Sequence, residues 1–180
     1  MRAFLAIPMP EDTATAMLEV QSRLPTGRPV PEDNLHLTLA FLGEVGEEVL
    51  ADMDETLSAT RLPVAEIAFG GLDTFAEMER GLAFVSVLHD DGLAALQAKV
   101  ERIARMAGAA LPRRRFRPHV TLMRSNRQPG GPARDRMAAA LGMPVDIPGF
   151  TATELVLYRS TLQPGGALHE PLESYPLSPF

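Results

Sequence analysis

The 180-residue sequence contains no cysteine, which excludes disulfide bonds, thiol catalysis and zinc sites with cysteine ligands. It also has no apolar run approaching the roughly 20 residues that a membrane-spanning helix requires. Glu11 and Asp12 follow the apolar N-terminal segment directly, without a cleavage site of small residues, so that segment is not typical of a signal peptide. We therefore expect a cytoplasmic protein without a membrane segment, and we interpret the first residues as a β-strand.

Several common catalytic signatures are missing as well. The sequence has no His-Glu-x-x-His motif, no Gly-x-Ser-x-Gly motif, and no glycine pattern of the Walker or Rossmann type. Zinc sites commonly use three or four ligands, and the four histidines of the chain are not arranged with acidic residues in such a pattern. We predict that the protein uses no metal and no cofactor.

The net charge of −6 argues against a general nucleic-acid coat protein, but the charge is unevenly distributed. Residues 99–127 contain nine lysines and arginines and one acid, so the rest of the chain carries −14 (−6 minus +8). One basic patch on an acidic body favours local binding of a phosphate group. Its densest part, residues 113–117, is either a phosphate-binding patch or a solubilising loop. Within it, Phe116 either stacks on an RNA base or anchors the loop.

The chain contains one pattern twice. A strand "AFLAI", a helix, a loop and a strand "HLTL" occur over about residues 2–42. A strand "AFVSV", a helix, a loop and a strand "HVTL" follow over about residues 81–124. Such long-range self-similarity predicts one two-lobed domain, over residues 1–180, with an internal duplication. A repeat within one chain already supplies two halves, so we expect a monomer.

Each copy ends on a strand with the pattern His-x-Thr: His36 with Thr38, and His119 with Thr121. Alternate residues of a strand point to one face, so each imidazole shares its face with a hydroxyl. Two histidines can supply a general base and a general acid near neutral pH, and two hydroxyls can bind the oxygens of a phosphate. These are the parts that a phosphodiester displacement needs. The same alternation places Phe41 on the opposite face, in the core.

At these residues the sequence resembles the 2H phosphoesterase superfamily, which is defined by two His-x-Thr/Ser-x motifs. Within it the chain is most similar to the RNA 2′,3′-cyclic phosphodiesterases, also called 2′–5′ RNA ligase-like proteins. The resemblance covers nearly the whole chain, through the segments "RAFLAIPMP", "NLHLTLAFLGEV", "FRPHVTLMR" and "LYRSTLQPGGALHEPL".

The resemblance implies a bilobal α+β fold, in which two pseudo-symmetric antiparallel sheets line a central cleft and helices cover the outside. It implies metal-independent opening of RNA 2′,3′-cyclic phosphate ends, or of small cyclic nucleotides, to 2′-phosphates, with reversible 2′–5′ ligation. It assigns His36 as the acid that protonates the leaving 3′ oxygen and His119 as the base that activates water. It assigns Thr38 and Thr121 as phosphate binders.

Two positions differ from the family pattern, and a third matches it. Many family members have an aromatic residue where Pro29 lies, and often a tyrosine where His169 falls, a histidine that we expect to be structural. Arg124 matches an arginine common after the second motif, which makes it a candidate for substrate binding. Strict alternation, however, places Arg124 on the face opposite His119, where it would form a structural ion pair.

The motifs leave two alternatives open, because they recognise the phosphate and not the base. The same chemistry could act on ADP-ribose cyclic phosphate or on 2′–5′ oligoadenylate. A module that binds RNA ends without turnover would use the same residues.

Overall fold

The computed structural model describes residues 1–74, 82–127 and 129–179. Gly81, at which the second predicted copy begins, lies outside the described residues. The helices and strands follow in the order β1 (Arg2–Pro8), α1 (Glu11–Gln21), β2 (Arg28–Pro29), the 3₁₀ helix η1 (Glu32–Asn34), β3 (His36–Glu44), α2 (Glu47–Ala59), β4 (Leu62–Pro63), β5 (Ala65–Ile67), β6 (Phe69–Thr74), β7 (Leu82–Val87), α3 (Asp91–Met106), β8 (His119–Arg124), α4 (Gly131–Leu141), β9 (Phe150–Ala152), β10 (Glu154–Gln163) and β11 (Gly166–Ser178).

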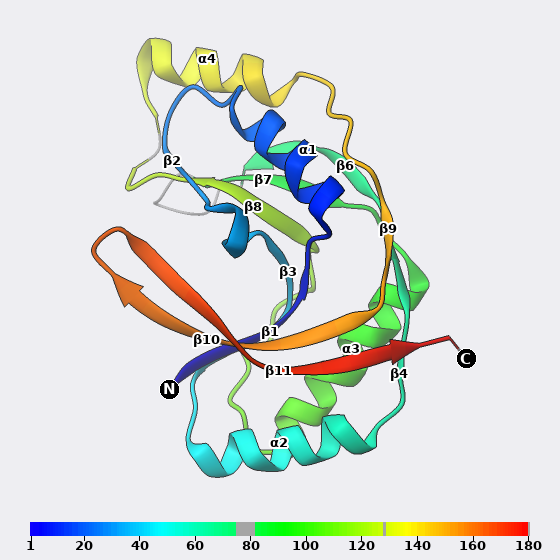
Figure 1. The fold of residues 1–180 in the computed structure, drawn as a ribbon. Helices are drawn as coiled ribbons and strands as arrows, with labels where there is room; N and C mark the ends of the chain where they lie inside the picture. The colour runs from blue at the N-terminus through cyan, green and yellow to red at the C-terminus, as the bar shows by residue number, and fades with distance from the viewer. Residues whose placement is uncertain (75–81, 128, 180) are drawn as a thin grey trace.

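Within the described residues, nine strands form one sheet and two more, β5 and β9, form a small separate one. Figure 1 shows how the strands and helices are arranged in space. The large sheet has the order β4-β11-β10-β1-β3-β8-β7-β6, with β2 paired to β8. Its pairs are antiparallel, except that β11 runs parallel to β4. The predicted α+β class is therefore confirmed. Of the helices described, none is long and apolar enough to cross a membrane.

The two predicted sheets are continuous, because β3 and β8 meet at the centre of the large sheet. Leu37 of β3 faces Val120 of β8 in an antiparallel register, and this is the pair that joins the two strands. Both side chains are completely buried. The sheets of the two halves thus meet at the two residues that follow the histidines.

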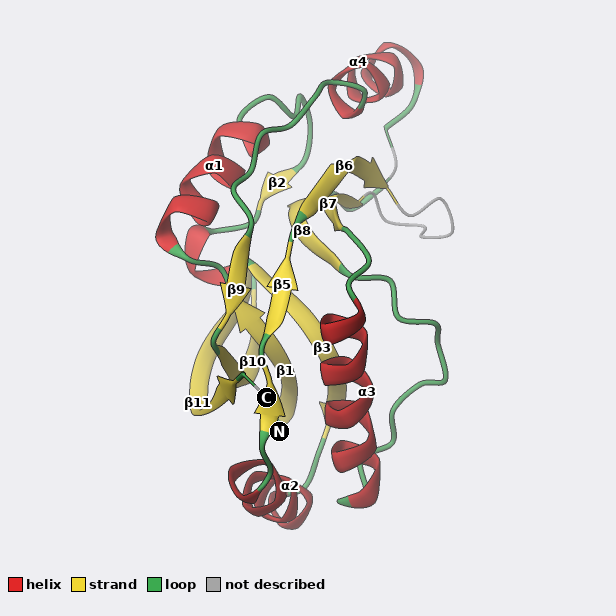
Figure 2. Ribbon diagram, turned by 90° about the vertical axis from the view of Figure 1, so that its right-hand side faces the viewer, coloured by secondary structure: helices red, strands yellow, loops and turns green. Residues whose placement is uncertain are grey.

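The two predicted copies correspond to β1–α1–β3 and β7–α3–β8. In each copy the helix packs against the histidine strand of the other copy: α1 against β8, and α3 against β3 (Figure 2). The helix α3 begins where the Asp90 carboxylate accepts a hydrogen bond from the Leu93 amide at 2.8 Å. After it ends, Gly108 adopts a φ of +99°, a conformation that glycine allows at a helix C-terminus.

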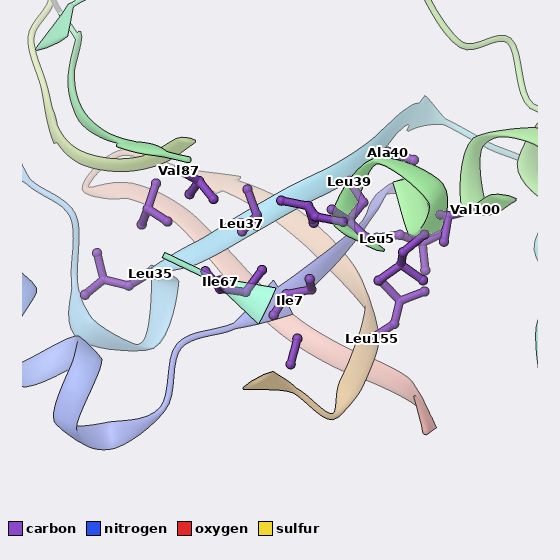
Figure 3. Packing of buried hydrophobic residues seen from close by; sticks show 14 of the residues in the cluster. Leu5, Ile7, Leu35, Leu37, Leu39, Ala40, Ile67, Val87, Val100 and Leu155 are labelled. Carbon is purple, nitrogen blue, oxygen red and sulfur yellow. The ribbon is translucent and has the colours of Figure 1, made fainter. Parts of the chain in front are cut away.

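The face of β3 opposite His36 lies in the hydrophobic core. Figure 3 shows Leu37 and Leu39 among the buried side chains of β1, α3 and β10, including Leu5, Val100 and Leu155. These side chains fix β3 in the sheet, so the residues that alternate with them are held on a rigid strand.

The prediction that Phe41 lies in the core is wrong, since its side chain is 43% exposed. Leu5 of β1 faces Ala40, and the next residue, Ala6, faces Thr38. Leu39 is therefore an extra residue in β3, a β-bulge, and it reverses the alternation of the residues that follow. Phe41 consequently lies on the face of His36, where the guanidinium of Arg2 sits 4.9 Å from the centre of its ring.

We expect Leu37→Ala to lower the free energy of unfolding by roughly 2–5 kcal/mol, because it opens a cavity at the junction of the two halves. Leu162→Ala, at a side chain that is 70% exposed, is the matched control and should change it by less than about 0.5 kcal/mol. Urea denaturation of both variants measures the difference. Equal effects would show that the junction does not depend on this side chain.

Candidate active site

The two His-x-Thr pairs lie on neighbouring strands at the junction of β3 and β8. Because Leu37 faces Val120, the antiparallel register sets His36 opposite Thr121 and Thr38 opposite His119. All four residues are half-buried on the same face of the sheet. Within the described part of the chain, neither threonine hydroxyl forms a hydrogen bond, so both can donate to a ligand.

Both imidazoles are held in the same way by the backbone. Nδ1 of His36 donates to the carbonyl oxygen of Asn34 at 2.7 Å, and Nδ1 of His119 donates to that of Arg117 at 2.7 Å. A carbonyl can only accept, so in each neutral ring the proton resides on Nδ1 and Nε2 is the basic nitrogen. Each strand therefore presents one oriented Nε2 that can take up or release a proton.

A phenylalanine ring contacts each of the two histidines. Phe4 stacks on His36 with ring centres 4.7 Å apart and on Tyr158 with ring centres 5.1 Å apart, and the ring centres of His36 and Tyr158 are 6.2 Å apart. Around His119 the corresponding phenylalanine, Phe84, makes an edge contact at 5.0 Å. The repeated strands thus place a phenylalanine beside each histidine, but with different geometry.

His169 of β11 is a residue whose place the sequence did not reveal. Its ring meets His36 edge-on at 5.2 Å and Phe4 edge-on at 4.8 Å. Its Nδ1 is buried and has no hydrogen-bond partner within the described residues. The spacing of residues in the sequence could not predict this contact, because it depends on the order β11-β10-β1-β3 of the strands in the sheet.

The prediction that Arg124 lies opposite His119 is wrong, for the same reason as that for Phe41. Ala83 of β7 faces Met123, and the next residue, Phe84, faces Thr121, so Leu122 is a β-bulge. The side chains of both Leu122 and Met123 are buried, and the alternation is reversed after them. Arg124 consequently shares the face of the histidines, and no acidic side chain in the described ranges pairs with it.

Two buried or half-buried glutamines hold the bulges, and sequence analysis missed both. Gln21 of α1 donates from Nε2 to the carbonyl of Leu122 at 2.7 Å, and to that of Val30 at 2.8 Å. Gln97 of α3 donates to the carbonyl of Leu39 at 3.3 Å. Each glutamine thus binds the third residue after a histidine, on the strand of the other copy. A glutamine on the buried face of a helix was the one available signal.

The charges at the site are positive. Burial, and then the positive charge of His169, lower the pKa of His36 to about 4, and Arg124 and His119 add to the effect. Burial and then Arg124 lower the pKa of His119 and of His169. Both candidate catalytic rings are therefore neutral near pH 7 in the free protein, and the cations around them favour an anionic ligand.

The other predicted positions have surroundings of different kinds. Phe116 packs against the hydrophobic core, which favours its interpretation as a loop anchor. The side chains of Arg113, Arg114 and Arg115 are exposed, and Pro29 is exposed in β2 opposite Met123. A search of the described residues finds no group of three or more histidine and acidic side chains able to hold a metal ion.

Comparison with known proteins shows the family of the chain. The family model of the 2′–5′ RNA ligase superfamily matches residues 9–163. The chain belongs to this superfamily. A superfamily member from Thermus thermophilus, named RNA 2′,3′-cyclic phosphodiesterase, is 31% identical over 98% of this chain and 90% of its own. The apo crystal structure of Escherichia coli LigT matches 98% of this chain and 97% of its own, with a TM-score of 0.81 and 26% identity. The resemblance found in the sequence is confirmed.

A relative of the same name from Geobacillus stearothermophilus is 30% identical over 97% of this chain. The chain spans 56% of the length of that relative, whereas it spans nearly the full length of LigT. The superfamily fold therefore occupies nearly all of this chain.

We expect His169→Phe to raise the pKa of His36 above about 4, because it removes a positive charge and keeps an aromatic edge against the ring. His89→Phe is the matched control, since His89 is exposed and contacts Asp91. Titration of the imidazole resonances by NMR measures both variants. A pKa of His36 that stays the same or falls would exclude the charge of His169 as a cause.

Proposed function

We propose that this protein hydrolyses RNA 2′,3′-cyclic phosphate ends to 2′-phosphomonoesters, with His36 and His119 as acid and base. One observation supports this above all. Two imidazoles and two threonine hydroxyls lie on one face of the adjacent strands β3 and β8, on either side of the pair formed by Leu37 and Val120. The imidazoles have the same tautomer, and the hydroxyls have no hydrogen-bond partner among the described residues.

In the proposed step, water attacks the phosphorus and gives a proton to Nε2 of His119. The bond from phosphorus to the 3′ oxygen breaks, and that oxygen takes a proton from Nε2 of His36. The product is a 3′-hydroxyl with a 2′-phosphate, and the proton that His119 gained restores His36 through solvent. Thr38, Thr121 and Arg124 donate to the non-bridging oxygens, where negative charge accumulates in the transition state.

The low pKa of His36 suits a proton donor once the substrate is bound. In the free protein an imidazole with a pKa of about 4 carries little charge at pH 7. An anionic phosphate within about 4–6 Å favours the charged form and raises that pKa, so the ligand itself promotes protonation. A ring that is protonated mainly beside the phosphate therefore holds a proton at the place where the leaving oxygen needs one.

Family membership confirms the predicted enzyme class, a phosphodiesterase, since curated relatives carry that name at about 30% identity. A structure of LigT with 3′-AMP supports a nucleotide ligand for the corresponding face of this chain. We further propose that the chain works as one two-lobed domain and as a monomer. Ligation would be the same step with the 5′-hydroxyl of a second RNA in the place of water: that oxygen bonds to the phosphorus of the cyclic phosphate, the bond to the 3′ oxygen breaks, and a 2′–5′ phosphodiester with a free 3′-hydroxyl forms.

The direct test incubates the protein with a 2′,3′-cyclic nucleotide in EDTA and follows the products by phosphorus NMR. We expect a 2′-phosphate product that EDTA does not suppress, because the two histidines supply both proton transfers. His36→Ala and His119→Ala should each reduce the rate by about 10²–10⁴-fold. His89→Ala, which removes an exposed histidine, should retain the wild-type rate.

A 3′-phosphate product would reverse the proposed choice of leaving oxygen. Turnover that EDTA abolishes, or that survives either catalytic substitution, would contradict the two-histidine mechanism.

The pH dependence of kcat/KM gives a second test. One ring must be protonated and the other neutral, so the profile should be bell-shaped whichever ring is the donor. The pKa of His36 is about 4 and that of His119 is lowered from about 6.5. We therefore expect kcat/KM to rise as the pH passes about 4 and to decline before it reaches about 6.5. A maximum above pH 7 would contradict the electrostatics of the site.

A further inference from the structure

Arg28 lies next to the site, on a strand that the proposed function does not use. In the pairing of β2 with β8, Arg28 is directly opposite Arg124. Directly opposed residues of an antiparallel pair project from the same face, with Cβ atoms about 4.5–5.5 Å apart. Since the bulge at Leu122 brings Arg124 to the face of the histidines, Arg28 extends that face by one strand.

The short strand β2 is held firmly against β8. The Val30 amide donates to the carbonyl of Leu122 at 2.9 Å, and Gln21 bonds the carbonyls of both residues. Gly27 precedes Arg28 with a φ of +112°, and a Cβ there would lie 2.6 Å from Cγ of Met123. Only glycine fits at such an approach, so the chain is built to bring Arg28 close to Arg124.

Two arginines in this arrangement lack an internal counter-charge. Neither Arg28 nor Arg124 forms an ion pair with an acidic side chain of the described residues. Burial and the charge of Arg28 lower the pKa of Arg124, as expected of like charges close together. Like charges directly opposed on neighbouring strands are destabilising, and a bound anion would relieve the repulsion.

Arg28 also reaches the other half of the molecule. Its Cζ lies 4.0 Å from the position of a Cβ on Gly166, at the turn between β10 and β11. Nδ2 of Asn34 donates to the carbonyl of Ala167 at 2.8 Å and fixes this turn. Arg28 thus lies between Arg124 on one side and the hairpin that carries His169 on the other.

We propose that Arg28 binds the next phosphate of the RNA, the one on the 5′ oxygen of the nucleotide whose cyclic end is opened. A chain that ends in a 2′,3′-cyclic phosphate can continue only through that 5′ oxygen. An arginine one strand beyond Arg124 offers the bidentate donors that a phosphate accepts. The inference rests on the proposed function for the terminal phosphate, and it specifies an oligonucleotide or a 5′-phosphorylated nucleotide as the preferred substrate class.

Two ligands that differ by one phosphate test the inference without turnover: adenosine 2′-phosphate and adenosine 2′,5′-bisphosphate. Calorimetry at about 50 mM salt gives the ratio of their dissociation constants. We expect the wild-type protein to bind the bisphosphate about tenfold more tightly or better, as a charge-assisted hydrogen bond provides. Arg28→Ala should reduce this ratio to within about twofold of unity, and leave binding of adenosine 2′-phosphate unchanged.

Two variants serve as controls. Arg28→Lys keeps the charge without the bidentate donors and should retain part of the ratio. Arg102→Ala removes an equal charge from an exposed position on α3 and should retain all of it.

The inference is overturned if Arg28→Ala weakens both ligands equally, if it leaves the ratio intact, or if the wild-type protein does not distinguish the ligands. Tight, Arg28-dependent binding of the bisphosphate by a protein that opens no cyclic phosphate would keep the inference and refute the proposed function. Turnover of cyclic nucleotides by a protein that binds the bisphosphate no more tightly than adenosine 2′-phosphate would keep the proposed function and refute the inference about Arg28.

Discussion

The carbonyl group of Leu122 is the point on which the arrangement of the site depends. It accepts hydrogen bonds from the Val30 amide and from Gln21, at 2.9 and 2.7 Å, and these bonds stabilise the bulge in β8. Without the extra residue, Arg124 would point into the core face, away from the histidines. The same bonds attach β2 to β8. One carbonyl therefore sets the direction of one arginine and the position of the strand that bears another.

The second bulge is held in a corresponding way, by Gln97 on the carbonyl of Leu39. The helix α1 packs against β8, and α3 packs against β3, so the helix of each copy donates a hydrogen bond to the histidine strand of the other copy. The halves are therefore mutually dependent. One copy without the other would retain its His-x-Thr pair. It would lose the glutamine that donates to the carbonyl of its β-bulge.

Sequence alone predicted the class of fold and the common face of each histidine and threonine, because period-two alternation holds over the three residues from His36 to Thr38 and from His119 to Thr121. It misplaced Arg124, as it misplaced Phe41, because both follow a bulge. A bulge has no marker in the strand itself when its cause is a glutamine on a distant helix. His169 was assigned a structural role for a similar reason: strand order, which spacing does not reveal, brings it to His36.

The pairing of β10 and β11 with β1 has a wider consequence. On the other side of the sheet the outer neighbour of β7 is β6, and only the β1 side carries Tyr158 and His169. The two imidazoles belong to the same motif, yet only His36 lies next to β1 and contacts the rings that Phe4, Tyr158 and His169 supply there. The two ends of the site therefore differ, although the strands that carry the histidines have the same pattern. A ligand with two different ends would bind such a site in one orientation. The two histidines would then take different roles in the reaction, although their strands have the same pattern.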